Sequence, residues 1–427
     1  LQYDTSVAQG QQILDSTILQ QVAGGHVDAA SPVVVFGWSQ SSGISSLTMS
    51  QLASQGVPSD DVHFVLVGDT NNPNGGLFDR FDGLADTNPS LAGIGFTLGG
   101  GPTPDDLYPT DVYTNEYDVV ADFPRYPIDV LSDLNAALGI IQHIPYPALT
   151  PEQIASATLL PGSAALTGEG LANFYMIPAE TLPLLFPLQL IPFIGQPLYD
   201  LLEPDMRILV NLGYGNIENG WDPGPANVAT PFGLFPTDIN WGDVLTALGS
   251  GLQQGITDAI EQLQNPDNYK ISTILENPLL SQLVTVVHDF GFTDATDISQ
   301  LLNLPALLEV ARNGLGQATG FPTSDVSLFS SSPTEIINDL TGTVSADYAT
   351  LLPVADGINA LLTSVPAYDV SVIEHQLEAG SLLGALTDPL IADEVLALFG
   401  PFLAGASIAV AAGGTLVNLA DLFGLGG

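Results

Sequence analysis

The fold of this chain is decided by one stretch, residues 33–41, which reads VVVFGWSQS. Its first four residues, three of them β-branched, predict a short and fully buried strand. Gly37 then opens a tight turn, Ser39 lies at its apex, and the small residues from Ser41 onward begin a predicted helix. A strained strand-to-helix turn of this kind lifts a serine hydroxyl above a sheet. We therefore predict that Ser39 is a nucleophile, with Ser41 standing where the usual Gly-x-Ser-x-Gly pattern has its last glycine. The alternative is an ordinary polar turn.

The composition excludes several classes of protein. The chain has 427 residues, of which 45% are hydrophobic, enough to bury a sizeable core in two domains or in one domain with an extension. Five Lys and Arg against 47 Asp and Glu give a net charge of −42. Because phosphate binding depends on clusters of Lys and Arg, we exclude nucleic acid as a partner and disfavour docking on anionic lipid heads.

The sequence also indicates whether the protein is exported or cytosolic. There is no cysteine, which excludes disulfides, a thiolate nucleophile and cysteine-based metal sites. The chain begins at Leu1 without Met, and no charged segment with an apolar core precedes it, so we expect a processed or trimmed product. An acidic, almost lysine-free chain rich in Gly and Pro favours an exported protein over a cytosolic one.

Strand and helix patterns alternate through the first part of the chain. Residues 3–23 have the spacing of an amphipathic helix, and residues 63–68 predict a second buried strand that a polar loop follows. The elbow strand, its helix and this strand form a βαβ unit, which implies a parallel sheet with right-handed crossovers. In such sheets the chemistry lies at the carboxyl ends of the strands, where Ser39 and Asp69 both fall.

The later elements are predicted from the same patterns. Further strands are predicted over 94–98 and 112–117, and a helix over 129–141 leads to His143 in a loop. The remaining predictions are a hairpin over 155–176, an irregular Pro-punctuated lid or side layer over 182–209, a loop over 213–236, a helix over 241–263, and short helices over 271–287, 298–311, 334–340, 351–363 and 373–386.

The last apolar stretch, residues 395–420, has no charged residue and is long enough to span a bilayer. Pro401 and the glycines at 413 and 414 interrupt it, and no basic residue flanks it. We therefore predict a buried or interfacial pair of helices here, with a true membrane span as the alternative.

A serine nucleophile needs a base and an acid that orients the base. Of the five histidines, only His143 is predicted to follow the sheet strands, and it comes after an acid at a strand end. The order Ser, Asp, His is the one that α/β-hydrolases use. Asp118, at the end of the strand over 112–117, is the preferred acid and Asp122 the alternative. Asp69 has neighbours that favour a turn-forming role, and a structural role is the alternative for His143.

The backbone N–H of Gln40, the residue after the nucleophile, is the predicted oxyanion donor. Thr5 and Ser6 are candidates for the second donor, and the sequence leaves this open. Other chemistries fit poorly. Pro73 stands at a ligand position of the would-be EF-hand over 69–74, no His pair has zinc spacing, and the glycines over 99–101 precede Pro rather than Lys. No metal or cofactor is predicted.

Several segments together resemble the PE-PPE domain, a cutinase-like serine α/β-hydrolase domain of mycobacteria and related actinobacteria. They are GWSQS (37–41), GDTNNPNGG (68–76), YDVVADFP (117–124) and LSDLNA (131–136). The resemblance continues through LPLL (182–185), IPFIG (191–195) and NLGYG (211–215), and covers about residues 1–263. The strand and loop that usually precede this segment in the family, and its PE or PPE helical region, are not seen.

The resemblance implies an exported serine esterase or acyltransferase that acts on acyl esters at the cell envelope without a cofactor. It places the family's serine on Ser39, its acid on Asp118, with Asp122 as the alternative, and its histidine on His143.

We therefore expect an α/β-hydrolase domain over residues 1–264 and a helical C-terminal extension over 265–427. Association of this extension with the membrane or envelope is one option. The expected substrate is an acyl ester of a lipid or glycolipid, and the expected location is the cell envelope, the cell surface or the medium. The alternative function is a non-catalytic structural or interaction protein of the envelope, built on a hydrolase scaffold.

Overall fold

The computed structural model describes residues 2–91, 95–191, 194–265, 277–289 and 363–398. By internal contacts the chain divides into two compact units, one of residues 1–282 and 360–399 and the other of residues 283–359 and 400–427. The fold below is that of the first unit, apart from residues 283–289, which belong to the second. The expected boundary after residue 264 stays a prediction. The predicted helices over 298–311 and 334–340 lie outside the described residues, as do residues 351–362 of the next predicted helix and nearly all of the apolar stretch over 395–420.

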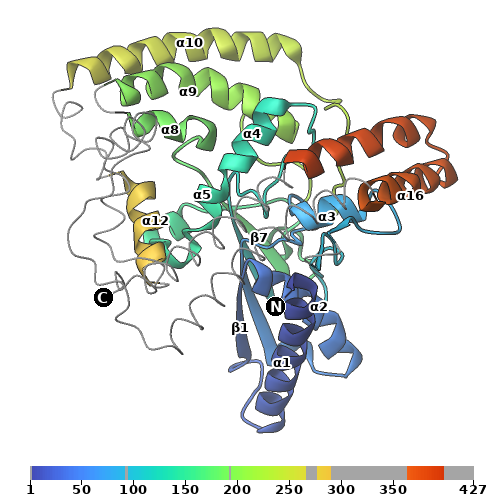
Figure 1. Ribbon diagram of the computed structural model, residues 1–427. Coiled ribbons are helices and arrows are strands. Elements are labelled where there is room, and N and C mark those ends of the chain that lie inside the picture. Colours follow the sequence, from blue (N-terminus) through green and yellow to red (C-terminus); the bar gives the residue numbers. More distant parts are fainter. Residues whose placement is uncertain (1, 92–94, 192–193, 266–276, 290–362, 399–427) are drawn as a thin grey trace, which may run out of the picture. The chain divides into compact units, whose positions relative to one another are not determined.

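The centre of this unit is a five-stranded sheet with the strand order β1-β2-β5-β7-β6 (Figure 1). Four strands run parallel, and the short β6 pairs antiparallel with β7 at one edge. The strands are β1 (Val33–Trp38), β2 (Val62–Val67), β5 (Thr110–Asn115), β6 (Thr158–Leu159) and β7 (Ala172–Ile177). With helices on its flanks, this mostly parallel sheet confirms the predicted α/β class.

Two helices frame the elbow strand. Helix α1 (Tyr3–Ala23) has the predicted bounds, and α2 (Gln40–Ser54) follows β1 directly. The main core forms where inward side chains of the sheet meet these helices, and its fully buried members include Ile18, Met49, Leu52, Phe64, Val112 and Phe174. The sheet and α2 therefore hold the elbow rigidly from both sides.

One prediction for the elbow strand is wrong. Residues 33–36 were expected to be fully buried, but Val34 and Phe36 are 64% and 63% exposed, while Val33 and Val35 are buried. The physical reason is that β1 is an edge strand among the described strands, and the described residues cover only one of its faces. Alternation of burial along β1 follows from the two-residue period of a strand.

Other segments differ from prediction in their bounds. The strand expected over 94–98 is only β4 (Phe96–Thr97), which pairs with β3 (Ser90–Leu91) in a separate antiparallel sheet. Strand β5 ends at Asn115 rather than at residue 117, because the chain turns at Tyr117, whose φ is +65°. The hairpin expected over 155–176 is present as the antiparallel pair β6 and β7.

The helix expected over 129–141 is two helices, α4 (Val130–Leu138) and α5 (Ile140–His143). Gly139 lies between them, where a Cβ atom would be 1.9 Å from the carbonyl oxygen of Tyr117. The glycine therefore allows α5 to approach the loop that follows β5.

The segment over 182–209 is more regular than expected. It contains a 3-10 turn (Pro183–Leu185), α8 (Phe186–Gln189) and most of α9 (Gly195–Asn211). Helix α10 (Trp241–Gln264) packs along α9 (Figure 1), and Gly255 allows this, because a Cβ atom there would be 2.3 Å from the carbonyl oxygen of Leu201.

The remaining elements are short or lie late in the chain. They are 3-10 turns at Ser59–Asp61, Tyr146–Ala148 and Leu212–Tyr214, and the helices α3 (Leu77–Asp82), α6 (Pro151–Ala155), α7 (Ala164–Thr167), α12 (Pro278–Asp289), α16 (Val365–Glu378) and residues 382–398. No helix within the described ranges combines the length and the apolar character needed to cross a bilayer.

The described residues include three arginines, and each is bound within the protein. Arg80 donates to the carbonyl groups of Phe123 and Thr230, Arg125 pairs with Asp222, and Arg207 pairs with Glu203 and Glu116. The other two cationic residues, Lys270 and Arg312, lie outside the described residues.

Candidate active site

The elbow presents Ser39 between the end of β1 and the start of α2. The backbone of Ser39 has φ +56° and ψ −123°, a region that non-glycine residues rarely adopt. Its N–H donates to the carbonyl of Val67 at 3.1 Å, which fixes the turn against β2. The Ser41 hydroxyl accepts from the Trp38 N–H at 2.7 Å and donates to the Trp38 carbonyl at 2.8 Å. These bonds hold the strained turn in place.

Gly37 is required for the close approach of α2 to β1. A Cβ atom at this position would lie 2.9 Å from the carbonyl oxygen of Ser41 and from the Cα of Ser42. The structure thus has the strand, turn and helix of a nucleophile elbow, with a serine replacing its last glycine.

His143 lies beside the elbow. It is the last residue of α5, so the expected loop position is wrong by one short helix. Its Nε2 is 2.8 Å from the Oγ of Ser39, and its Nδ1 is 2.9 and 3.0 Å from the two carboxylate oxygens of Asp118. The imidazole therefore joins the serine hydroxyl to a carboxylate, which is the hydrogen-bonded order of a serine, base and acid relay.

Asp118 lies in the loop after β5 and is fully buried. One of its oxygens accepts from the N–H groups of Val120 at 2.9 Å and Ala121 at 3.2 Å, and the other accepts from the hydroxyl of Tyr146 at 2.7 Å. With the bond to His143, both carboxylate oxygens are satisfied. Such a set of donors holds the carboxyl group in one orientation.

The alternative acid, Asp122, has a different set of contacts. One oxygen accepts from the N–H of Tyr117 at 2.8 Å, and the other has no hydrogen-bond partner among the described residues. Burial raises the pKa of Asp122 well above its usual range. The structure therefore brings Ser39, His143 and Asp118 together and leaves Asp122 outside this group.

Asp69, at the end of β2, has the contacts of a turn-forming residue. It accepts from the N–H of Asn71 at 3.2 Å and from the hydroxyl of Thr103 at 2.6 Å. Burial raises the pKa of Asp69. These contacts shape the loop after β2 and give Asp69 no bond to His143.

Tyr146 and Gly68 were not singled out as site residues in the sequence. The Tyr146 hydroxyl donates to Asp118 and accepts from the N–H of Asn115 at 2.8 Å, so it links the acid to the end of β5. A Cβ atom on Gly68 would lie 2.9 Å from Cε1 of His143, and its φ is +57°. A glycine that ends a buried strand and a tyrosine three residues after the base are the signals that could have identified them.

Gln40 is the first residue of α2. The first N–H groups of a helix have no acceptor within the helix, so the N–H of Gln40 is available beside Ser39. Thr5 and Ser6 lie in the first turn of α1, and their role as second oxyanion donor stays a prediction. In the part of the chain that the structure describes, no three His, Asp or Glu side chains are grouped as metal ligands.

Comparison with known families gives a match to the PE-PPE domain over residues 1–215. Among curated proteins of Mycobacterium tuberculosis, the chain is 39% identical over 406 residues to the uncharacterized PPE family protein PPE28. It is 36% identical over 389 residues to the esterase PE16 and 36% identical over 323 residues to the PE family protein PE3. No solved structure matches the chain.

These alignments cover 93%, 90% and 73% of this chain. The chain spans 55%, 62% and 63% of the length of the same three relatives, which are therefore considerably longer proteins. Since 406 residues align with PPE28, the similarity extends well beyond residue 215.

Proposed function

This chain belongs to the PE-PPE domain family, and from that membership we propose that it is a serine esterase that forms an acyl-enzyme on Ser39. The observation that carries the proposal is the unbroken hydrogen-bonded series from the Ser39 Oγ through the His143 imidazole to the Asp118 carboxylate. The relative named as the esterase PE16 supports the same chemistry.

In the acylation step, His143 Nε2 takes the proton of the Ser39 hydroxyl while Oγ attacks the ester carbonyl carbon. The imidazolium that forms is stabilised by Asp118, which accepts from Nδ1. Negative charge develops on the carbonyl oxygen and is met by the N–H of Gln40. When the tetrahedral intermediate collapses, the bond to the alkoxy group breaks, and His143 gives its proton to the departing alcohol.

In the second step, His143 removes a proton from a water molecule that attacks the acyl-enzyme. This releases a carboxylic acid and restores the Ser39 hydroxyl. An alcohol in place of water would give a new ester, which is acyl transfer by the same residues.

The proposed substrates are acyl esters of lipids or glycolipids at the cell envelope, reached by an exported protein. The net charge of −42 argues against anionic substrates and against nucleic acid. The mycobacterial PE and PPE relatives support an envelope location. The proposed reaction needs no cofactor, because the relay supplies nucleophile, base and oxyanion donor.

A fluorophosphonate probe tests the proposal directly, because it reacts covalently with an activated serine. We expect labelling of the wild-type chain, no labelling of Ser39→Ala, and labelling reduced at least about a thousandfold in His143→Ala. A serine in the same helix and away from the relay, Ser50→Ala, is the matched control and should label like wild type. A folded wild-type chain that neither labels nor hydrolyses p-nitrophenyl acetate would favour the non-catalytic scaffold instead.

A further inference from the structure

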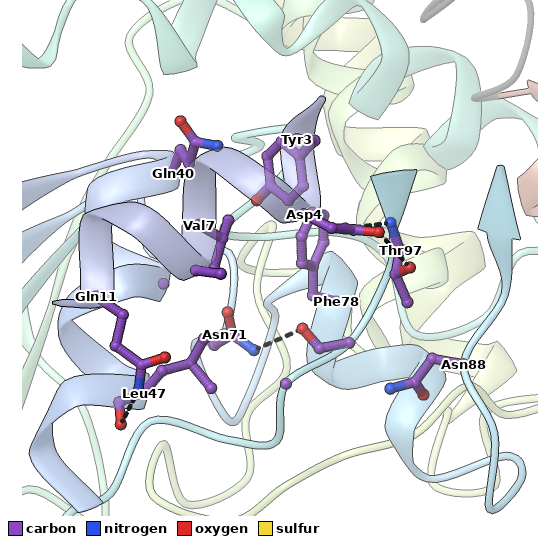
Figure 2. Close-up of a pocket in the computed structure, with 14 residues that line it drawn as sticks. Tyr3, Asp4, Val7, Gln11, Gln40, Leu47, Asn71, Phe78, Asn88 and Thr97 are labelled. Atoms are coloured by element: carbon purple, nitrogen blue, oxygen red, sulfur yellow. Dashed lines mark hydrogen bonds between the residues drawn. The ribbon is translucent and has the colours of Figure 1, made fainter. Parts of the chain in front are cut away.

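A cavity of about 260 Å³ lies next to the elbow, between α1 and α2 (Figure 2). Helix α1 contributes Tyr3 and Val7 to its lining, α2 contributes Leu47, and α3 contributes Phe78. Gln40, the residue after the candidate nucleophile, also lines it. The cavity therefore adjoins the residue whose N–H would meet the ester carbonyl oxygen.

Several polar side chains of the lining are engaged in hydrogen bonds within the protein. The Asn71 side chain donates to the carbonyl of Gly101 at 2.8 Å. The Gln11 side chain donates to the carbonyl of Leu47 at 3.2 Å (Figure 2). What faces the cavity is mainly hydrocarbon and the ring of Tyr3, a surface that favours an apolar ligand.

The charges of the lining residues restrict the class of ligand further. No Lys or Arg lines the cavity, so it offers no partner to a carboxylate or phosphate. Its one acidic residue, Asp4, accepts from both the N–H and the hydroxyl of Thr97 at 2.9 Å. A charged group would enter without compensation, which is costly away from water. The ligand is therefore an uncharged chain.

We propose that this cavity is the acyl pocket of the enzyme, and that it takes the hydrocarbon chain of a medium-length acyl ester. The proposal rests on the esterase function argued above. With the carbonyl carbon at Ser39 and its oxygen at the N–H of Gln40, the acyl chain continues past Gln40 into the space between α1 and α2. A cavity of about 150 Å³ holds benzene, with six heavy atoms, so this one has room for roughly ten.

The test is the chain-length profile of kcat/KM for p-nitrophenyl esters from acetate to palmitate. Ala8 lies at the exposed rim of the cavity, so Ala8→Trp blocks it without disturbing the core. We expect Ala8→Trp to lower kcat/KM for the decanoate at least about tenfold and to leave the acetate within about twofold. Gln9→Trp, on the exposed side of the same helix, is the matched control and should resemble wild type at every length.

The opposite change enlarges the cavity. Leu47→Ala should move the optimum to longer acyl chains, with the melting temperature measured alongside to establish that the variant is folded. Equal losses at all lengths in Ala8→Trp, or an unchanged profile in both variants, would overturn the pocket while leaving the esterase intact. A second series of substrates consists of acetate esters of alkyl alcohols of increasing length. If Ala8→Trp lowers kcat/KM only in this series, the cavity binds the alcohol part of the ester, and the proposal is also overturned.

A binding measurement separates the pocket from catalysis. In Ser39→Ala, methyl decanoate should raise the melting temperature, and the second substitution Ala8→Trp should abolish that rise. If neither the wild type nor any variant hydrolyses an ester, the proposed function is rejected. The change in melting temperature on adding methyl decanoate then still shows whether the cavity binds an acyl chain. A Ser39→Ala protein that shows no rise would reject the pocket.

Discussion

Two buried carboxyl groups in this molecule differ in their hydrogen bonds. Asp118, in the loop after β5, accepts from two backbone N–H groups, from the Tyr146 hydroxyl and from His143. Asp79, on α3, is equally buried, yet neither of its oxygens has a hydrogen-bond partner among the described residues. Burial and the neighbouring Asp82 raise the pKa of Asp79 to about 8.

The comparison separates burial from function. The loop after β5 surrounds its carboxyl group with hydrogen-bond donors, which fix the orientation of that group. Helix α3 offers Asp79 none, so the neutral form is favoured there. Burial of an acid is therefore no guide to its role in this fold, and the donors around it are.

The largest expected effect comes from making the same isosteric change at both acids. Asp118→Asn should lower kcat by about ten-thousandfold, because the amide cannot hold His143 in the tautomer and charge state that the reaction needs. Asp79→Asn should leave kcat for p-nitrophenyl acetate within about twofold, since Asp79 makes no contact with the relay. Steady-state kinetics of the two purified variants measure this. Comparable losses of kcat in Asp118→Asn and Asp79→Asn would contradict the difference in role between the two acids.

A smaller effect on kcat is expected from a substitution that adds a methyl group beside His143. Gly68→Ala should lower kcat about a hundredfold, because the new methyl group would lie 2.7 Å from Cε2 of Tyr146 and 2.9 Å from Cε1 of His143 and would displace both rings. The matched control is Gly56→Ala, where φ is also positive, at +79°, but nothing lies within 4 Å of the added atom. Both variants carry backbone strain, so unchanged kcat in Gly68→Ala would mean that His143 tolerates the displacement.

Tyr146→Phe should lower kcat about tenfold and leave KM nearly unchanged, because it removes one of the donors that orient Asp118. Tyr214→Phe is the control. The Tyr214 hydroxyl is also buried, and it donates to the carbonyl of Asp122 at 3.1 Å, away from the relay. Both variants should lose stability, measured by urea denaturation, but only Tyr146→Phe should lose rate. A rate loss in Tyr214→Phe of the same size would make Tyr146 a structural residue only.

The smallest effect concerns stability and pH. Asp79 has a folded-state pKa of about 8, above the value of about 3.9 expected in the unfolded chain. The folded state therefore binds the proton more tightly, and its contribution to stability is lost as pH rises from about 4 through 8. Between pH 5 and pH 8.5 the melting temperature of wild type should fall by roughly 3–8 °C more than that of Asp79→Asn. Parallel melting curves would contradict the assigned pKa.

Much of the sheet and of the candidate site could be predicted, because the relevant signals are local. The β-branched run before Ser39 and the turn after it define strand and elbow within nine residues. Parallel strands bring their carboxyl ends to one edge, so Ser39 and Asp118 could be expected together before any contact was known. His143 followed from the order of the three residues.

What could not be predicted depends on neighbours distant in sequence. The exposure of Val34 and Phe36 reflects what lies against β1, not the composition of the strand. The role of Tyr146 depends on a side chain 28 residues away. Helix α9 tolerates Pro204 in its interior because packing along α10 stabilises it, which a local rule against proline in helices misses.

The internal engagement of Arg80, Arg125 and Arg207 has a consequence for turnover. Hydrolysis of an ester gives an acid that ionises at neutral pH, and the described surface has no arginine left to retain it. The excess of negative charge, −42 over the whole chain, repels the newly formed carboxylate. In the proposed hydrolysis, this repulsion would favour departure of the product. Because salt screens such forces over about 10 Å at 0.1 M ionic strength, inhibition by the released acid should grow as salt is added.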